Sequence, residues 1–209
     1  MDYYKRALEL NDETIKNRRY FHMNAEAGLH MPMACVYVMD KLTEYGLVPS
    51  RCGEGVTATV GNGGKVLLLR ADMDALPMPE ESGLPFACPT GKEAHACGHD
   101  FHAAMLLTAA KMLKENEAEL KGTVKFMFQP AEETGAGAAP CCELFQKEAV
   151  SEIYGAHNLP GFPEGEIYTR PGTFACASRG VTLRFQGAPT HAAYPENGKN
   201  PALAVGKLL

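Results

Sequence analysis

The spacing of apolar residues predicts three helices in the first part of the chain. Residues 2–22 carry apolar side chains among charged ones, which indicates an amphipathic helix. Residues 32–45 form a second candidate, with proline at the start and Gly46 directly after the end, the positions that these residue types favour at helix termini. Residues 100–113 place alanines and leucines on one face, as a helix packed on a sheet requires.

Shorter apolar runs predict strands. Residues 56–60 alternate, and Asn62-Gly63-Gly64 then leads into the continuous apolar run 65–70, which predicts a hairpin that feeds a buried strand. Residues 123–129 place a valine and two phenylalanines on one face. Further strands are expected over residues 152–156, 165–170, 174–178 and 181–185.

Strands and helices alternate along the chain, which indicates the α/β class. We expect a doubly wound mixed sheet flanked by helices over residues 1–178. A smaller α+β domain is expected to begin at residues 179–209, where a new alternating strand appears. Residues 202–209 predict a helix with proline near its start but no capping residue at its end. We therefore expect the chain to be a fragment of a longer protein.

Composition and charge favour a soluble protein that acts on a small molecule. Of the 209 residues, 45% are hydrophobic and 22% are charged, which is enough apolar content for a core. The formal net charge of −5 and the lack of a dense basic run argue against nucleic acid and anionic membrane as partners. No segment approaches the ~20 apolar residues of a membrane span, and no signal peptide is evident. We expect a cytoplasmic protein whose seven scattered cysteines are reduced.

Metal-binding residue types concentrate in the segment His95-Ala96-Cys97-Gly98-His99-Asp100-Phe101-His102. Because side chains two positions apart do not share a helix face, Cys97 and His99 are expected in the turn before the helix. Downstream, a pair of glutamates follows one predicted strand and a histidine follows another. Groups that converge from several strand ends are typical of a catalytic metal site. The predicted ligands are Cys97, His99, Glu133 and His157.

Each of these residues alone has a plainer explanation. A single cysteine is usually a small buried hydrophobe, and a single histidine is usually a hydrogen-bonded polar group. The His-x-Cys-x-His spacing, with two more groups at strand ends, favours metal binding instead. Glu132, beside the ligand Glu133, is then free to take a proton from metal-bound water, whose pKa falls to about 7. This combination predicts a hydrolase.

Five segments, in order, resemble metal-dependent amidohydrolases of the aminoacylase and carboxypeptidase superfamily. The nearest branch contains hippurate hydrolases, N-acyl-amino-acid amidohydrolases and auxin-conjugate hydrolases. The N-terminal residues Phe21-His22 and Glu26-x-Gly28 resemble the same branch. The five segments are residues 70–77, 95–100, 128–133, 155–158 and 191–193.

The resemblance implies a zinc-exopeptidase-like catalytic domain with two divalent metal ions. Cys97 would bridge the ions, and Glu132 would act as general base and acid. The remaining implied ligands within this chain are His99, Glu133 and His157. A final histidine ligand is expected beyond Leu209. The metal is left open, because cysteine suits zinc while carboxylates and histidines also admit manganese, cobalt or nickel.

Three further residues match positions of the family. Asp74 matches the aspartate that orients a ligand. Asp72 stands where the wider superfamily usually has a metal-binding histidine. This change is typical of the branch, in which His99 is expected to take over the role of that histidine. The alternative for Asp72 is that of a structural acid that caps the loop. His191 matches a histidine of the lid and dimerisation domain that stabilises the oxyanion across a dimer, and its alternative role is that of a surface turn residue.

Two hypotheses from different classes follow. The first is an amidohydrolase that cleaves N-acyl amino acids and is a homodimer when full length. A metallo-dipeptidase or aminoacyl exopeptidase on the same scaffold is its near rival. The second is an inactive metal-binding module, which would have no need for a spare carboxylate such as Glu132. The preferred acyl group and amino acid are not specified by these residues.

Overall fold

The computed structural model describes residues 1–147, 149–177 and 179–208. The chain forms two compact units, Met1–Gly161 and Phe162–Leu209. The domain boundary expected between residues 178 and 179 stays a prediction, because Ser178 lies outside the described residues.

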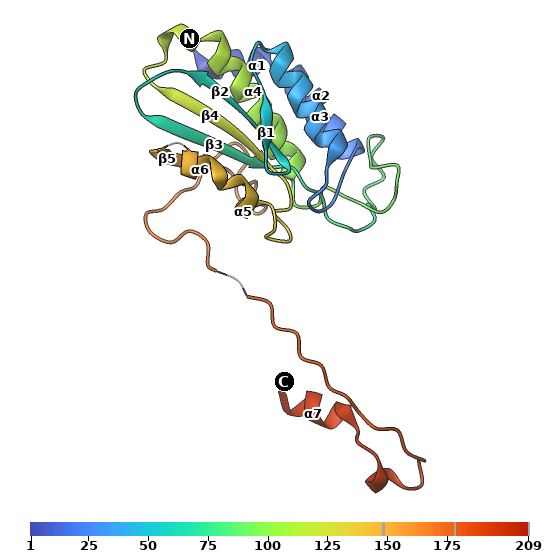
Figure 1. Ribbon diagram of the computed structural model, residues 1–209. Helices are drawn as coiled ribbons and strands as arrows, with labels where there is room; N and C mark the ends of the chain where they lie inside the picture. The colour runs from blue at the N-terminus through green and yellow to red at the C-terminus, as the bar shows by residue number, and fades with distance from the viewer. Residues whose placement is uncertain (148, 178, 209) are drawn as a thin grey trace. The chain divides into compact units, whose positions relative to one another are not determined.

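The first unit is built on a five-stranded mixed sheet, with strand order β1-β2-β4-β3-β5 (Figure 1). Strand β3 pairs in parallel with β4 and β5, whereas β2 pairs in antiparallel fashion with β1 and β4. The strands are β1 (Ser50–Cys52), β2 (Gly55–Gly61), β3 (Val66–Asp72), β4 (Thr123–Gln129) and β5 (Glu152–Gly155).

The prediction that β2 and β3 form a hairpin is wrong. Both strands exist and the turn lies where expected, but β4 inserts between them, so that Val124 pairs with Val60 on one side and Leu67 on the other. A continuous apolar strand such as β3 is stable when both of its edges are paired, and here β4 and β5 provide those neighbours. The turn passes close to the connection into β4, since a Cβ on Gly64 would lie 2.4 Å from the Lys121 carbonyl oxygen.

The helix expected over residues 2–22 is two helices, α1 (Tyr3–Glu9) and α2 (Asn11–Met23). Leu10 leaves helical geometry, with φ −91° and ψ 1°, and buries its side chain. The other two helices agree with expectation, as α3 (Pro32–Glu44) and α4 (His99–Glu115). A short 3₁₀ turn, η1 (Glu117–Glu119), follows α4.

Helices cover both faces of the sheet, which confirms the predicted fold class. On one face the core combines Phe126 and Phe128 of β4 with residues of α2, α3 and α4, including Phe21, Leu42 and Leu107. On the other face, Leu68 and Met127 pack with two short helices, α5 (Ala138–Cys141) and α6 (Glu143–Lys147). Figure 1 shows these two layers on either side of the strands.

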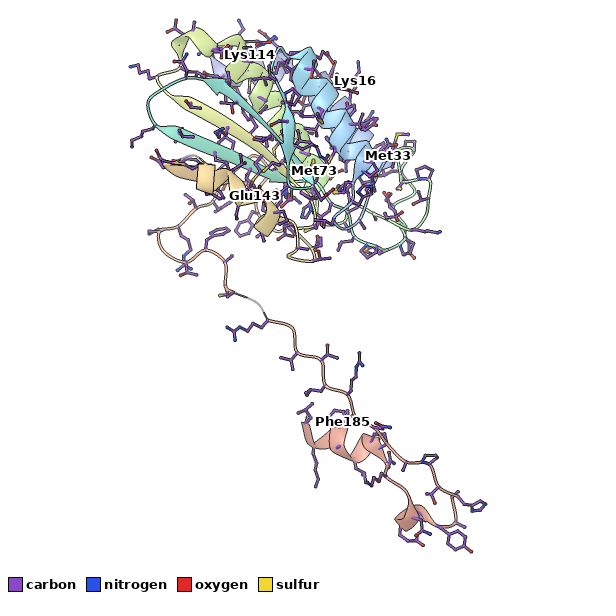
Figure 2. The ribbon with its side chains drawn as sticks, in the orientation of Figure 1. Lys16, Met33, Met73, Lys114, Glu143 and Phe185 are labelled. Carbon is purple, nitrogen blue, oxygen red and sulfur yellow. The ribbon has the colours of Figure 1, made fainter. Side chains whose placement is uncertain are left out.

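The second unit contains the 3₁₀ turn η2 (Pro195–Asn197), the helix α7 (Pro201–Leu208) and an isolated bridge between Ala188 and Lys199. The described residues of the segments 165–170, 174–178 and 181–185 form no strands, contrary to prediction. Phe185, labelled in Figure 2, is 40% exposed, as expected for an alternating segment with no partner strand to cover it. Among the described residues, no helix is long and apolar enough to cross a membrane.

Candidate metal centre

Residues of types that bind metal follow the carboxyl ends of the parallel strands. Because β3 lies between β4 and β5, the loops that follow these three strands meet at one edge of the sheet. Met73, labelled in Figure 2, is fully buried where the chain leaves β3, and an aspartate stands on each side of it. The glutamate pair follows β4, and His157 follows β5. The sheet thus brings together residues that are far apart in sequence.

His99, the first residue of α4, lies at the centre of this edge. Its side chain is fully buried, yet neither ring nitrogen has a hydrogen-bond partner. Burial by itself would lower the pKa of His99, but the surrounding carboxylates outweigh it and raise the pKa. The carboxylate oxygens near His99 Nε2 are Glu133 Oε1 at 3.7 Å, Asp72 Oδ2 at 3.8 Å and Glu132 Oε2 at 3.9 Å. His99 Nδ1 is 3.4 Å from Asp74 Oδ1.

A buried polar atom without a partner is rare in proteins and calls for an explanation. Carboxylates, a thiol and imidazoles around such an atom are the donor set of a divalent transition-metal site. In two overlapping groups the possible ligand atoms lie within 4.8 Å of one another: Cys97, His99 and His157 in one, and His99, Glu132 and Glu133 in the other. All four predicted ligands and Glu132 are therefore gathered around His99, and they fit a metal ion.

Cys97 precedes α4 in a turn, as predicted, whereas His99, expected in the same turn, is already the first residue of the helix. Its Sγ lies 3.5 Å from His157 Nε2. Burial raises the pKa of the Cys97 thiol to about 12, and the neighbouring Glu133 carboxylate adds to the effect. Since a metal ion binds the thiolate, binding would release this proton.

Asp74 fixes the positions of the two glutamates. Its carboxylate accepts the backbone N–H groups of Glu132 at 3.0 Å and of Glu133 at 3.1 Å. Burial raises the pKa of Asp74, but His99 and these two N–H groups hold it below its usual range. Ala131, directly before the pair, takes a left-handed φ of +48°, which turns the chain out of β4.

The two glutamates differ in access to solvent. The Glu132 side chain is 43% exposed and the Glu133 side chain 23%. Both residues as a whole are exposed, so access to solvent does not by itself divide the roles of base and ligand. These roles stay predictions, as does that of Asp74.

Two participants were missed by the sequence analysis, His102 and Asn158. His102 Nδ1 lies 2.6 Å from Asp72 Oδ1, and the backbone N–H of Asn158 donates to His102 Nε2 at 3.0 Å. The available signal was the spacing of His99 and His102, which places both on one face of α4. Asp72, His99 and His102 form a third group of possible ligands. His102 differs from His99, however, because both of its nitrogens already have protein partners.

Asp72 is held by protein groups on both sides. Burial raises its pKa, but His102 and the Arg70 guanidinium outweigh this and lower the pKa to about 2. Arg70 donates from Nη1 to Asp72 Oδ2 at 2.6 Å.

His191 belongs to the second unit. There its Nδ1 accepts the backbone N–H of Ala193 at 3.1 Å, and its side chain is exposed. Its expected contact with the reacting group stays a prediction.

The sequence profile of peptidase family M20/M25/M40 matches residues 68–205. An N-acetyl-L-cysteine deacetylase of Bacillus subtilis (strain 168) is 37% identical over 204 residues, which cover 96% of this chain and 49% of the relative. A hippurate hydrolase of Campylobacter jejuni subsp. jejuni is 36% identical over 208 residues, covering 97% of this chain and 54% of the relative. The chain spans about half the length of these curated relatives.

A solved structure supports the same assignment. It is a dinuclear metal binding peptidase of the M20 family from Bacillus subtilis, with 38% sequence identity and a TM-score of 0.70 over 74% of this chain and 45% of that one. The resemblance drawn from the five sequence segments is thereby confirmed. The chain belongs to peptidase family M20/M25/M40.

Proposed function

We propose that the protein carrying this chain is a metal-dependent hydrolase that cleaves the amide bond of N-acyl amino acids. The observation that carries the proposal concerns the buried His99. Neither of its ring nitrogens forms a hydrogen bond, and its side chain belongs both to the group with Cys97 and His157 and to the group with Glu132 and Glu133. The relatives named as an N-acetyl-L-cysteine deacetylase and a hippurate hydrolase support this substrate class. The dinuclear neighbour supports two divalent ions.

Cys97, His99, Glu133 and His157 would hold the ions, with zinc, manganese, cobalt or nickel as the candidates. The bound ions would polarise the scissile carbonyl and supply hydroxide at neutral pH. The enzyme is further proposed to be a cytoplasmic homodimer.

Glu132 is the general base and acid of this proposal. Its carboxylate accepts a proton from the attacking water and returns it to the nitrogen of the departing amino acid. Asp74 orients this carboxylate through the Glu132 backbone N–H. His191 of a second copy of the chain, reaching across the dimer, would stabilise the oxyanion that forms on the scissile carbonyl.

The test combines a substrate panel with one substitution. Hippurate, N-acetyl amino acids and dipeptides are compared, and we expect the N-acyl amino acids to be cleaved with the highest kcat/KM. Glu132→Gln keeps the shape of the side chain but removes the base, so turnover should fall about 100-fold or more while metal content stays near that of the unmodified protein. Glu119→Gln, an exposed change outside the site, serves as the matched control.

Each other outcome contradicts a particular part of the proposal. Loss of metal together with activity in Glu132→Gln would show that Glu132 is a ligand and that Glu133 is the base. Faster cleavage of dipeptides would indicate an exopeptidase. Full metal loading without turnover of any substrate would indicate a binding module.

A further inference from the structure

Two histidines on the first turn of α4 face the same region but differ in their surroundings. His99 has no hydrogen-bond partner at either nitrogen. His102, buried to a similar degree, is engaged at both, by the Asp72 carboxylate and by the Asn158 backbone. A histidine whose two nitrogens are both engaged is unsuited to bind a metal directly, but it can orient the groups to which it is hydrogen-bonded.

The tautomer of His102 follows from its partners. Asp72 is paired with Arg70 at 2.6 Å and is therefore an ionised acceptor. His102 Nδ1 must then carry the proton that it donates to Asp72. This leaves a lone pair on Nε2, which accepts the Asn158 backbone N–H.

The contact between the Asn158 side chain and His102 agrees with this tautomer. One end of the Asn158 side-chain amide lies 2.6 Å from His102 Nε2. The backbone hydrogen of Asn158 is fixed by the peptide plane, whereas the oxygen and nitrogen of a side-chain amide exchange places by a simple rotation. The side-chain amide is therefore assigned with its NH₂ group toward Nε2.

The backbone of Asn158 also contacts the neighbouring His157, through its carbonyl oxygen. His157 Nδ1 donates to the Asn158 carbonyl oxygen at 2.7 Å. The proton of His157 is thus held on Nδ1, and the lone pair of Nε2 faces Cys97 Sγ at 3.5 Å.

Asn158 is also packed tightly against the turn that carries Cys97. A Cβ on Gly98 would lie 2.3 to 2.7 Å from the atoms of the Asn158 side-chain amide, so only glycine leaves room there. Behind Asp72, Arg70 is fixed by a second bond from its Nε to Gln129 Oε1 at 3.0 Å, at the end of β4. A continuous chain of hydrogen bonds therefore links four elements. It begins at Gln129 of β4, passes through Arg70 and Asp72 of β3 and His102 of α4, and ends at Asn158 in the loop after β5.

We propose that His102 is a positioning residue which, backed by Asp72 and Arg70, fixes the backbone of Asn158 through its N–H and thereby helps to aim His157 Nε2 at the Cys97 side of the metal centre. The inference rests on the proposed function, because it explains how one ligand of that centre is oriented. It assigns no ligand role to His102.

Two substitutions of His102 separate its two contacts. His102→Asn places an amide N–H close to the original Nδ1 and can keep the bond to Asp72, but it withdraws the acceptor from Asn158. His102→Gln places an amide oxygen closer to the original Nε2 and can keep the Asn158 bond. His30→Gln, at an exposed histidine, is the matched control.

The first measurement needs no metal and no turnover. Amide hydrogen exchange of Asn158 and the ring tautomer of His157 are followed by NMR on the ¹⁵N-labelled chain. We expect His102→Asn to lose protection at Asn158 and to mix the His157 tautomers, and His102→Gln to retain both. Wild-type protection and tautomer in His102→Asn, in a chain that remains folded by thermal unfolding, would overturn the proposal.

The second measurement is a zinc titration of the same proteins. His102→Asn should bind zinc about 10- to 100-fold more weakly, the usual effect of removing a group that orients a ligand, and His102→Gln should lie closer to wild type. If the His102 ring nitrogens themselves shift on zinc addition and both variants lose affinity equally, His102 is a ligand and the proposal is wrong. Absence of hydrolysis with intact NMR behaviour would count against the proposed function alone.

Discussion

Asp74 joins parts of the site that lie far apart in sequence. Its carboxylate, directly after β3, accepts the two backbone N–H groups that begin the Glu132–Glu133 segment, and it faces His99 Nδ1 at 3.4 Å. A single side chain therefore connects His99, a proposed ligand on α4, with the glutamates that follow β4.

We expect Asp74→Asn to weaken both the fold and the metal site. The change replaces one acceptor oxygen with an NH₂ group that faces a backbone N–H donor, so one buried donor loses its partner, at a cost of about 1–3 kcal/mol in the free energy of unfolding. Zinc affinity should fall as well, because the glutamates lose their common anchor. Denaturant unfolding and zinc titration measure the two effects, with Asp40→Asn, an exposed change on α3, as control. Unchanged zinc affinity would contradict the anchoring role.

Most of the residues that gather at the candidate site could be predicted from residue types, but the contacts among them could not. Cys97 and His99 stand out as metal-binding types at the start of a predicted helix, and Glu133 and His157 as such types after predicted strands. Asn158 does not stand out in this way, because it contacts His102 through its backbone N–H, which any residue other than proline would supply. His95, in the same motif as His99, lies outside the three groups of possible ligands among the described residues. Burial lowers the pKa of His95 to about 4.

At the scale of elements, the start of α4 depends on Gly98. This residue is the N-cap of the helix and takes φ +85°, a left-handed conformation that favours glycine. The turn orients Cys97 on one side and His99 on the other, and the Asn158 side chain fills the space in which a Cβ would lie.

Gly98→Ala should cost more stability than a glycine substitution that changes φ alone. Gly91 also has a positive φ, of +63°, but nothing lies within 4 Å of the site of its Cβ. Gly91→Ala should therefore lower the free energy of unfolding only by the cost of a left-handed alanine, about 1–2 kcal/mol. Gly98→Ala should lower it by that amount and, in addition, by the cost of displacing the Asn158 side chain. The comparison is made by denaturant unfolding of both variants. Equal losses of unfolding free energy in the two variants would show that displacing the Asn158 side chain has no energetic cost.

Elements set by local pattern were predicted well, and those set by distant partners were not. The bounds of β4 follow from alternation alone, and α3 from its proline and glycine. The pairing of β2 with β4 instead of β3 depends on contacts across the sheet, about which the turn at Gly63 and Gly64 carries no information. The break at Leu10 was missed for a related reason, since burial of that side chain depends on tertiary packing.

At the scale of the whole molecule, the N-terminal helices are tied to the loops of the site. The Glu26 carbonyl oxygen accepts the N–H of Ala75 at 2.8 Å, directly after Asp74. His22 of α2 lies between two carboxylates, with Nδ1 2.7 Å from Asp100 Oδ2 and Nε2 2.9 Å from Glu80 Oε1. These contacts give the N-terminal signature residues a structural role, because they join α2, the loop that contains Glu80 and the start of α4.

Glu80 should make the stability of the molecule sensitive to acid. Burial raises its pKa, but the Ser82 hydroxyl, His22 and the Cys88 backbone N–H outweigh this and lower the pKa to about 2. A carboxyl group whose pKa is lower in the folded than in the unfolded state contributes stability that is fully present above the unfolded value, about 4.3, and is lost as the pH falls toward the folded value. The other charged groups that face this cluster are Asp100 and Arg18, whose Nε lies 2.7 Å from Asp100 Oδ2.

Glu80→Gln tests this contribution, since it removes the titrating group and leaves a side chain of the same size. The free energy of unfolding of the variant should be lower than that of the unmodified chain at pH 6 and should approach it as the pH falls from about 4.5 to about 2. Denaturant unfolding at a series of pH values measures both curves, and Glu81→Gln, at the exposed neighbouring position, is the control. Parallel curves for Glu80→Gln and the unmodified chain over this range would show that the link between α2 and the loop does not depend on the charge of Glu80.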